Sequence, residues 1–467
     1  MKNNQLSMNN LTNDQQKAIQ AIWDFLLNPN QVELIIDGGA GTGKTWLINY
    51  ISQAFYDEYK KLCSLFNIKP LTAIFVTATT NKAVSVLNQK LSFGSAITIH
   101  KLLKVIPSYD FHTGETILIR PPSSMNKFVA PKNSLIIIDE CSMIDKELAY
   151  ILNRDLDDSN KIIYVGDKCQ LPPVNESIST IYSKAITNIN LSEPVRNKGF
   201  LPLVQLCSQL RETVLTNQFK DIQLVPGVID YIPDKQSFIN EVKSVFTKPQ
   251  LTHRILSYTN ELSLKLNEMI ATQVKQYSKP YVANEYYICN SPYRTPQVSH
   301  KVYNKQFAIN NEEIVKIVSI KSKPTKQTVK ASIDFDTAFE DKEQIEFYEA
   351  QVISQITRAS YKVNLVQDPI KYRKLLQKLK RQKRYAMWAA LNDFILDIRA
   401  FEAMTIHKSQ GSTFETVYID LSDLGKCRNP YVVSRLLYVA VSRASHRVVF
   451  TGSLPEEYGK LICSTTC

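Results

Sequence analysis

Residues 38–45, with the sequence GGAGTGKT, constrain the fold of this chain more than any other segment. They fit the pattern GxxxxGK(S/T), whose glycines let backbone N–H groups point inward around phosphate oxygens. A short apolar run at residues 32–37 precedes the segment, and a helical pattern follows from Lys44. The positive end of a helix that begins at such a loop favours a bound anion. The sequence therefore predicts a phosphate-binding loop, with an ordinary glycine turn as the alternative.

The residue types of this loop indicate ATP with Mg²⁺ as the ligand. Lys44 would place its ammonium against the β and γ phosphates, and the Thr45 hydroxyl would ligate Mg²⁺. A second apolar run, residues 136–138, ends in Asp139 and Glu140. Because ligands bind at the carboxyl ends of parallel strands, Asp139 would hold Mg²⁺ and Glu140 would polarise the attacking water as general base. The predicted nucleotide-binding residues of the loop are Gly38, Gly39, Ala40, Gly41, Thr42, Gly43, Lys44 and Thr45.

The composition narrows the environment and the partners of the chain. Its net charge of +12 favours a polyanionic partner, with a solvated basic surface as the alternative. The eight cysteines show neither a CxxC pair nor zinc spacing, as expected for free thiols in a reducing cytoplasm. No apolar run reaches the roughly 18 residues that a membrane helix needs. We therefore expect a cytoplasmic protein that makes no membrane contact.

Short apolar runs alternate with helical patterns along most of the chain. They occur at residues 73–76, 135–138, 162–165, 254–258, 417–419 and 448–450. Several are β-branched on both faces, which is typical of parallel strands covered by helices on both sides. We predict an α/β fold with two domains. The first is expected at residues 1–185 with an inserted hairpin at 105–132, the second at 186–278 and 400–467, and an inserted module at 279–399.

Further segments carry longer motifs. They are residues 11–15 (LTNDQ), 77–83 (TATTNKA), 98–101 (TIHK), 166–174 (GDKCQLPPV), 191–196 (LSEPVR), 255–260 (ILSYTN), 405–413 (TIHKSQGST) and 437–444 (LYVAVSRA). In this order, and across nearly the whole chain, they resemble the motifs of superfamily 1 helicases of the RecD and phage Dda type. The resemblance implies two RecA-like P-loop domains with parallel sheets and an inserted module that is SH3-like and helical.

The resemblance also implies roles for further residues of the ATP site. Gln15 would read the adenine, although a capping box for the following helix explains the same residue. Gln170 would link the γ-phosphate to the DNA-facing surface, and Gly411 would let backbone approach the phosphates. Arg196 and Arg443 would reach across from the second domain as arginine fingers.

The same resemblance places a set of polar residues along the DNA. They are Thr80, Asn81, His100, Thr259, Asn260, Thr405, His407 and Lys408. Short polar side chains suit phosphate contacts, although Thr80 also fits a helix cap. Independently of the resemblance, residues 371–385 hold eight basic residues and no acid. Lys378 and Arg381 are therefore predicted phosphate contacts, with a solvated helix face as the alternative.

Strand separation needs a structural wedge, which in the resembling family is a hairpin inserted in the first domain. Residues 108–120 are the candidate for it in this chain. Its apolar side chains would either stack on the last base pair or pack onto the domain. They are Tyr109, Phe111, Ile117 and Ile119.

We therefore expect an ATP-dependent DNA helicase that moves along single-stranded DNA and unwinds duplex DNA, with a 5′ to 3′ polarity implied by the resemblance alone. A translocase that does not unwind, or a nucleic-acid-binding module with a degenerate ATPase, are the alternatives. Intact Lys44, Asp139 and Arg443 argue against the degenerate module, and a P-loop kinase for small molecules would not account for the later motifs. Expected partners are single-stranded DNA, fork DNA, and replication or recombination proteins. A monomer is expected, in the host cytoplasm at the nucleoid if a phage encodes the chain.

Overall fold

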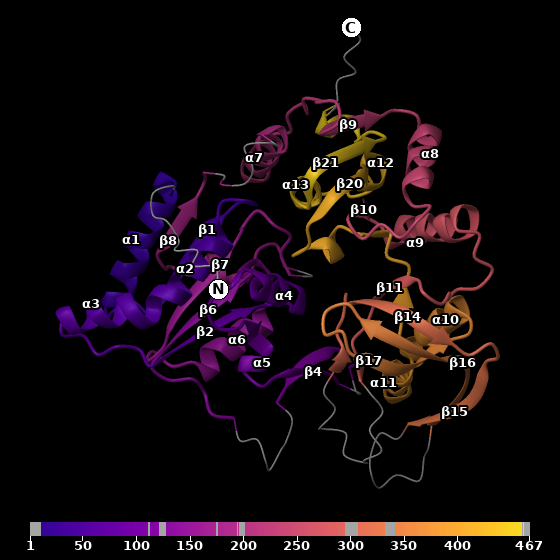
Figure 1. Cartoon of the computed structure of the whole chain (residues 1–467), viewed down its shortest axis with the longest axis horizontal. Coiled ribbons are helices and arrows are strands. Elements are labelled where there is room, and N and C mark those ends of the chain that lie inside the picture. Colours follow the sequence, from indigo (N-terminus) through magenta and orange to yellow (C-terminus); the bar gives the residue numbers. More distant parts are fainter. Residues whose placement is uncertain are drawn as a thin grey trace.

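The computed structural model describes residues 11–110, 113–120, 128–173, 176–193, 195, 201–294, 307–331, 341–459 and 461. They form two lobes with parallel sheets and a module with an antiparallel sheet. In Figure 1 the first lobe lies at the left, the second lobe at the upper right and the module at the lower right. Within these described ranges, no helix is both long enough and apolar enough to span a membrane.

The first lobe has a six-stranded sheet in the order β3-β2-β6-β7-β1-β8, and all its strand pairs are parallel. Its strands are β1 (Glu33–Gly38), β2 (Ala73–Ala78), β3 (Ile97–Thr98), β6 (Ser134–Asp139), β7 (Lys161–Gly166) and β8 (Asn188–Leu191). Its helices are α1 (Asn13–Leu27), α2 (Lys44–Ala54), η2 (Phe55–Tyr59), α3 (Lys60–Leu65), α4 (Asn81–Lys90), α5 (Ile99–Leu102), η3 (Cys141–Met143), α6 (Lys146–Asp155) and η4 (Thr180–Ser183). Separate apolar clusters cover the two faces of the sheet, which explains the continuous apolar runs of its strands.

The edge strand β8 corrects the predicted boundary between the domains. It pairs in parallel with β1, with Ile189 opposite Ile36, so the first sheet extends to Leu191 rather than ending by residue 185. The strand has four residues and alternates half-buried and exposed side chains before its buried last residue. Such a short edge strand lacks the continuous apolar run that predicts the central strands.

The second lobe has a five-stranded parallel sheet in the order β19-β10-β20-β21-β9. Its strands are β9 (Ile229–Ile232), β10 (His253–Ser257), β19 (Ala403–Thr405), β20 (Phe414–Asp420) and β21 (Ala444–Thr451). Its helices are α7 (Leu201–Thr216), α8 (Lys235–Val245), α9 (Asn260–Met269), η6 (Ile270–Val274), η8 (His407–Ser409), α12 (Leu421–Leu424), α13 (Pro430–Ser442) and η9 (Glu456–Tyr458). Helix α7 shares the core of this lobe with α13. Two parallel α/β lobes confirm the predicted fold class.

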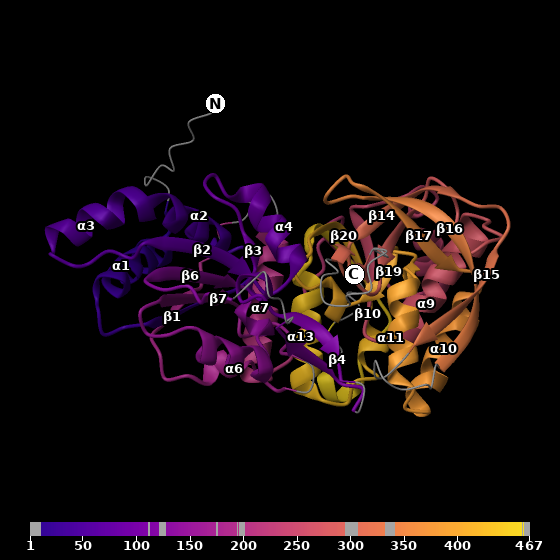
Figure 2. The same cartoon turned by 90° about the horizontal axis from the view of Figure 1, so that it is seen from below.

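A hairpin extends from the first lobe toward the module (Figures 1 and 2). Its strands β4 (Ile106–Tyr109) and β5 (Thr116–Ile119) are antiparallel, which confirms the predicted hairpin. At its base, Arg120 forms an ion pair with Asp155 of α6 at 2.5 Å. At its tip, a Cβ on Gly114 would lie 2.2 Å from the Tyr385 ring of the module. The hairpin is therefore anchored at its base and lies against the module near its tip.

The module carries an antiparallel sheet in the order β15-β16-β14-β11-β18, with β17 beside β16. These strands are β11 (Tyr286–Cys289), β14 (Ile314–Ile320), β15 (Thr325–Ala331), β16 (Asp341–Ser354), β17 (Ser360–Val366) and β18 (Ile398–Arg399), and β12 (Tyr293–Arg294) pairs separately with β13 (Phe307–Ile309). Helices α10 (Pro369–Arg381) and α11 (Tyr385–Phe394) pack on the sheet through an apolar cluster that includes Phe347, Leu379 and Leu391. The basic run at residues 371–385 thus forms α10 and the turn after it.

Candidate nucleotide site and nucleic-acid track

The predicted phosphate-binding loop connects β1 to α2. Gly41 and Gly43 have φ angles of 83° and 94°, in the left-handed region that glycine adopts without strain. A Cβ on Gly43 would also lie 2.4 Å from Nε2 of Gln15. Inside the loop, the Thr42 hydroxyl donates to the Gly39 carbonyl at 3.0 Å. The glycines therefore permit the conformation of this loop, and the hydrogen bond from the Thr42 side chain stabilises it.

The Lys44 ammonium folds over the mouth of this loop. Its Nζ donates to the carbonyl oxygens of Gly38 at 2.5 Å and of Gly39 at 2.8 Å. Both acceptors are neutral, and the ionised oxygens of a phosphate are stronger acceptors for the same ammonium. Lys44 is thus placed to exchange two carbonyls for phosphate oxygens when a nucleotide binds.

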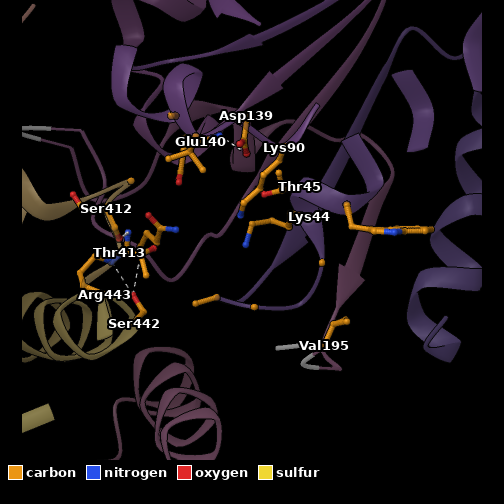
Figure 3. Close-up of a pocket in the computed structure, with 18 of the residues that line it drawn as sticks. Lys44, Thr45, Lys90, Asp139, Glu140, Val195, Ser412, Thr413, Ser442 and Arg443 are labelled. Carbon is orange, nitrogen blue, oxygen red and sulfur yellow. Dashed lines mark hydrogen bonds between the residues drawn. The ribbon is translucent and has the colours of Figure 1, made fainter. Parts of the chain in front are cut away.

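The loop faces a cavity of about 350 Å³ between the two lobes, which Figure 3 shows in close-up. Its lining combines predicted residues of both lobes. The first lobe contributes Ala40, Gly41, Gly43, Lys44, Thr45, Asp139, Glu140 and Gln170, and the second contributes Gly411, Ser412, Thr413, Ser442 and Arg443. A site that both lobes complete can respond to the movement of one lobe against the other.

The acidic side of the cavity is built at the end of β6. Asp139 is the last residue of this strand, and Glu140 follows with a φ of 55°, a left-handed conformation that is costly for a residue with a Cβ. Burial and the neighbouring Glu140 carboxylate raise the pKa of Asp139 to about 7. A divalent cation favours the ionised carboxylate, and carboxylate and hydroxyl oxygens are the ligands that Mg²⁺ prefers. Asp139 and Thr45 therefore fit the predicted metal site.

Three buried oxygen atoms around the cavity have no hydrogen-bond partner in the part of the chain that the structure describes. They are Oε2 of Glu140, Oε1 of Gln170 and Oγ of Ser412. Buried polar atoms are normally paired, so open acceptors in a cavity indicate a ligand or an ordered water. Together with Lys44, these atoms fit a triphosphate and the water that attacks it.

Arg443 reaches the same cavity from the C-terminal end of α13. Its guanidinium donates to the carbonyl oxygens of Val439 at 3.2 Å and of Ser412 at 3.3 Å, and to the Ser442 hydroxyl at 2.8 Å. All three partners belong to the second lobe. The predicted arginine finger therefore lines the cavity while its own lobe holds its side chain.

Arg196 and Gln15 are the two remaining residues predicted for the ATP site. Arg196 lies outside the described residues, and Val195 donates its N–H to the Gly41 carbonyl at 2.8 Å, so residue 195 lies against the loop. The amide of Gln15 accepts from the Thr12 N–H, and the Thr12 hydroxyl accepts from the Gln15 N–H, both at 3.2 Å. The capping box is thus confirmed, and adenine recognition by Gln15 stays a prediction.

The predicted DNA-contacting segments of the two lobes meet beside the cavity. The Lys82 ammonium of α4 donates to the Lys408 carbonyl at 3.5 Å, which joins residues 77–83 to residues 405–413. A Cβ on Gly411 would lie 4.0 Å from the Thr80 hydroxyl oxygen. The Lys408 ammonium donates in turn to the side chain of Asn290 in the module. All three parts of the protein therefore touch at this point.

Some predicted DNA contacts are available at the surface and others are used by the fold. Asn81, Asn260 and His407 are exposed. Burial lowers the pKa of His100, so its imidazole is neutral at pH 7 and could meet a phosphate only as a hydrogen-bond donor. Lys378 and Arg381 are exposed residues of α10, and this helix lies on the side of the module away from the first lobe (Figures 1 and 2).

Three threonines of the predicted track serve local structure. The Thr80 hydroxyl accepts from the Ala83 N–H as the cap of α4. The Thr259 hydroxyl donates to Asp423 at 2.6 Å, and Thr405 is buried in β19. The Thr259 hydroxyl is therefore engaged as both donor and acceptor, and the Thr405 hydroxyl is covered, whereas the Thr80 hydroxyl only accepts and keeps its own proton for donation.

Four cavity residues lie outside the motifs that the sequence shows. Trp46 and Asn49 lie on one face of α2, and Val86 and Lys90 lie on one face of α4. Residues spaced by three or four share one face of a helix. The same spacing, counted from Ala83 along α4, leads to Val86 and Lys90, and counted from Thr45 along α2 it leads to Asn49, whereas Trp46 directly follows Thr45 and has no such signal.

Comparison with known proteins agrees with this geometry. The family described as an AAA domain matches residues 20–176, and the family described as a UvrD-like helicase C-terminal domain matches residues 400–451. The ATP-dependent DNA helicase Dda of Enterobacteria phage T4 is 24% identical over 95% of this chain and 100% of its own length. Protein R530 of Acanthamoeba polyphaga mimivirus is 24% identical over 93% of this chain and 98% of its own. The crystal structure of Pif1 helicase from Candida albicans covers 98% of this chain and 97% of its own, with 16% identity and a TM-score of 0.45.

Two parallel α/β lobes with a phosphate-binding loop at their interface define a two-lobed P-loop NTPase. The first matched family covers residues 20–176 of the first lobe, and the second covers residues 400–451 of the second lobe. Within that class, the chain is similar to the helicase Dda over 95% of its length, and to the RecBCD enzyme subunit RecD of Buchnera aphidicola and the helicase Pif1 of Campylobacter jejuni over 36% of its length each. The resemblance inferred from the motifs is thereby confirmed.

Proposed function

We propose that this chain is an ATP-dependent DNA helicase that moves 5′ to 3′ along single-stranded DNA and unwinds duplex DNA. One observation carries the proposal: the phosphate-binding loop of the first lobe and Arg443 of the second lobe line one cavity. Beside that cavity, the two segments expected to grip the strand touch through Lys82 and Lys408. The relative Dda, which is matched over its full length, is itself an ATP-dependent DNA helicase.

The residues of the cavity have separate tasks in ATP hydrolysis. Lys44 and the N–H groups of the loop bind and orient the phosphates, and Thr45 and Asp139 would hold Mg²⁺. When bound, Mg²⁺ neutralises charge on the phosphate oxygens. Glu140 accepts a proton from the attacking water through the carboxylate oxygen that has no partner among the described residues. Arg443 adds a planar positive group where charge develops.

Hydrolysis is coupled to movement because the same segments serve both sites. Gly411 lines the cavity and approaches the hydroxyl oxygen of Thr80, beside the exposed Asn81. When Arg443 leaves its contacts with the second lobe, the loop that carries Ser412 loses a hydrogen-bond donor. A change at the phosphates is thereby expected to alter the grip on the strand.

The hairpin of β4 and β5 supports unwinding over translocation alone. A wedge works only if it resists force, and this hairpin is fixed at its base by Arg120 and abuts Tyr385 at its tip. Of the candidate wedge residues, Ile117 is 36% exposed. Phe111 and the side chain of Tyr109 lie outside the described residues.

The proposal is tested with duplexes that carry either a 5′ or a 3′ single-stranded tail, in DNA and RNA versions. We expect ATP-dependent strand separation only with the 5′ DNA tail, and an ATPase rate that rises when single-stranded DNA is added. An ATPase that single strands stimulate, but that separates neither duplex, would favour the translocase alternative. An ATPase rate indifferent to single strands would overturn the proposal.

A second prediction concerns the exposed basic residues of α10. Replacing Lys378 and Arg381 with glutamine is expected to weaken single-stranded DNA binding and to flatten its salt dependence, by about 0.7 in the slope of log affinity against log salt for each lost phosphate contact. The measurement is fluorescence anisotropy of a labelled oligonucleotide across a salt series. The control is Lys61→Gln with Lys69→Gln, which removes the same charge from exposed positions of the first lobe. Equal slopes in both double variants would show that α10 is only a solvated face.

A further inference from the structure

Two buried carboxylates lie side by side at the ends of neighbouring strands in the first lobe. Asp37 of β1 is opposite Gly166 of β7, and Asp167 follows directly. Both side chains are fully buried. Their own lobe provides backbone donors, since Lys168 N–H lies 2.7 Å from Asp37 and Cys169 N–H lies 3.0 Å from Asp167. Two adjacent buried negative charges need positive charge nearby.

The second lobe supplies that charge. Arg211 of α7 donates through Nη2 to Asp37 at 2.8 Å, and its Nε lies 3.5 Å from Asp167. The ammonium of Lys168 lies farther away, at 3.9 Å from Asp37. One guanidinium of the second lobe therefore spans both carboxylates of the first, and separation of the lobes at this point would leave the pair without its closest cation.

A second side chain connects these carboxylates to the phosphate-binding loop. The Tyr438 hydroxyl of α13 donates to Asp167 and accepts from the Ala40 N–H at 3.1 Å. A Cβ on Gly39 would lie 3.2 Å from Arg211 and 3.3 Å from the Tyr438 hydroxyl oxygen. Residues 39 and 40 of the loop thus lie directly against two side chains of the opposite lobe.

Other side chains of the second lobe hold the segment that follows Asp167. Arg435 donates to the carbonyl oxygens of Lys168 at 2.5 Å and of Gln170 at 2.7 Å. Gln410 donates to the Leu171 carbonyl at 3.1 Å. Segment 167–171, which carries the cavity residue Gln170, is therefore fixed by the second lobe along its length.

We propose that Arg211 and Tyr438 are positioning residues through which contact with the second lobe holds the phosphate-binding loop in its nucleotide-binding conformation. This proposal rests on the proposed function of the cavity as an ATP site. It explains how contact between the lobes sets the affinity of that site for nucleotide. Neither residue needs to touch the nucleotide. Tyr438 acts on the backbone of Ala40, and Arg211 keeps Asp167 in place to orient the Tyr438 hydroxyl.

The phenylalanine variant of Tyr438 separates this role from a structural one. Tyr438→Phe keeps the ring in the core and removes only the hydroxyl, so the Ala40 N–H loses its acceptor and the loop can take other conformations. If only a fraction of the loops can bind nucleotide, the apparent affinity for ATP is the intrinsic affinity multiplied by that fraction. Saturating ATP still brings all loops into the binding conformation. We expect KM for ATP to rise about tenfold, which corresponds to one hydrogen bond to a charged network, while kcat stays within about twofold of the parent.

The experiment measures kcat and KM for ATP hydrolysis with saturating single-stranded DNA, and Kd for a fluorescent derivative of ADP. Tyr458→Phe is the matched control, because its hydroxyl is also buried in the second lobe but donates to the Cys427 carbonyl at 3.3 Å. Arg211→Lys keeps the charge and loses the fork, and it should raise KM and Kd in the same direction.

The outcomes distinguish the two proposals. KM and Kd within twofold of the parent in both Tyr438→Phe and Arg211→Lys would overturn the positioning role, as would a loss of kcat at unchanged KM, which is the signature of a smaller folded fraction. A parent chain that binds no adenine nucleotide would instead overturn the proposed function. Should Tyr438→Phe fail to fold, Arg211→Lys alone decides.

Discussion

Replacing Lys44 with alanine is expected to lower ATP turnover by at least about a thousandfold, because the phosphates lose the preorganised cation closest to them. Among the described residues, the Lys44 ammonium donates to the carbonyl oxygens of Gly38 and Gly39, and its side chain lines the cavity. Its removal therefore leaves the core of the first lobe intact. The segments that touch at Lys82 and Lys408 are also unchanged, so single-stranded DNA binding should persist.

The measurement pairs ATPase assays with anisotropy titrations of a labelled oligonucleotide. Lys61→Ala serves as the control, since it removes the same side chain from an exposed position on α3 of the same lobe. Turnover within tenfold of the parent would show that Lys44 does not act on the phosphates. Loss of DNA binding together with turnover would point to a damaged fold instead.

The central strands and the phosphate-binding loop could be predicted because each has a local cause. A strand buried on both faces is a continuous apolar run, as in β6 and β7, where every residue is buried. The loop needs glycine at residues 41 and 43, whose φ angles are positive. The strand β8 has neither feature, since it lies at the edge and alternates, and the domain boundary was therefore placed too early.

The site was only partly predictable because its hydrogen bonds join residues far apart in the sequence. Thr259 resembles a DNA contact, yet its hydroxyl is bound by Asp423, 164 residues later. Arg211 and Asp37 are separated by 174 residues, and Tyr438 and Asp167 by 271. Motifs identify which residues matter for nucleotide chemistry, but only the packing of the lobes shows which carboxylate receives which donor.

Arg443→Ala is expected to reduce the kcat of ATP hydrolysis stimulated by single-stranded DNA by about a thousandfold, the usual contribution of an arginine finger. Its KM for ATP should change little, because the guanidinium is held by Ser412, Val439 and Ser442 of its own lobe and, in the proposed mechanism, would reach the phosphates only when the lobes close. An interaction made only in the transition state affects kcat rather than ground-state binding.

If closure of the lobes brings Arg443 to the phosphates, the same variant must lose kcat and still bind nucleotide. Arg443→Lys should recover little, since an ammonium lacks the planar fork that spans two phosphate oxygens. Arg428→Ala is the control, because Arg428 is exposed on the same lobe. A turnover within tenfold of the parent in a folded Arg443→Ala chain would mean that this arginine serves the second lobe alone, and that closure of the cavity does not complete the catalytic site.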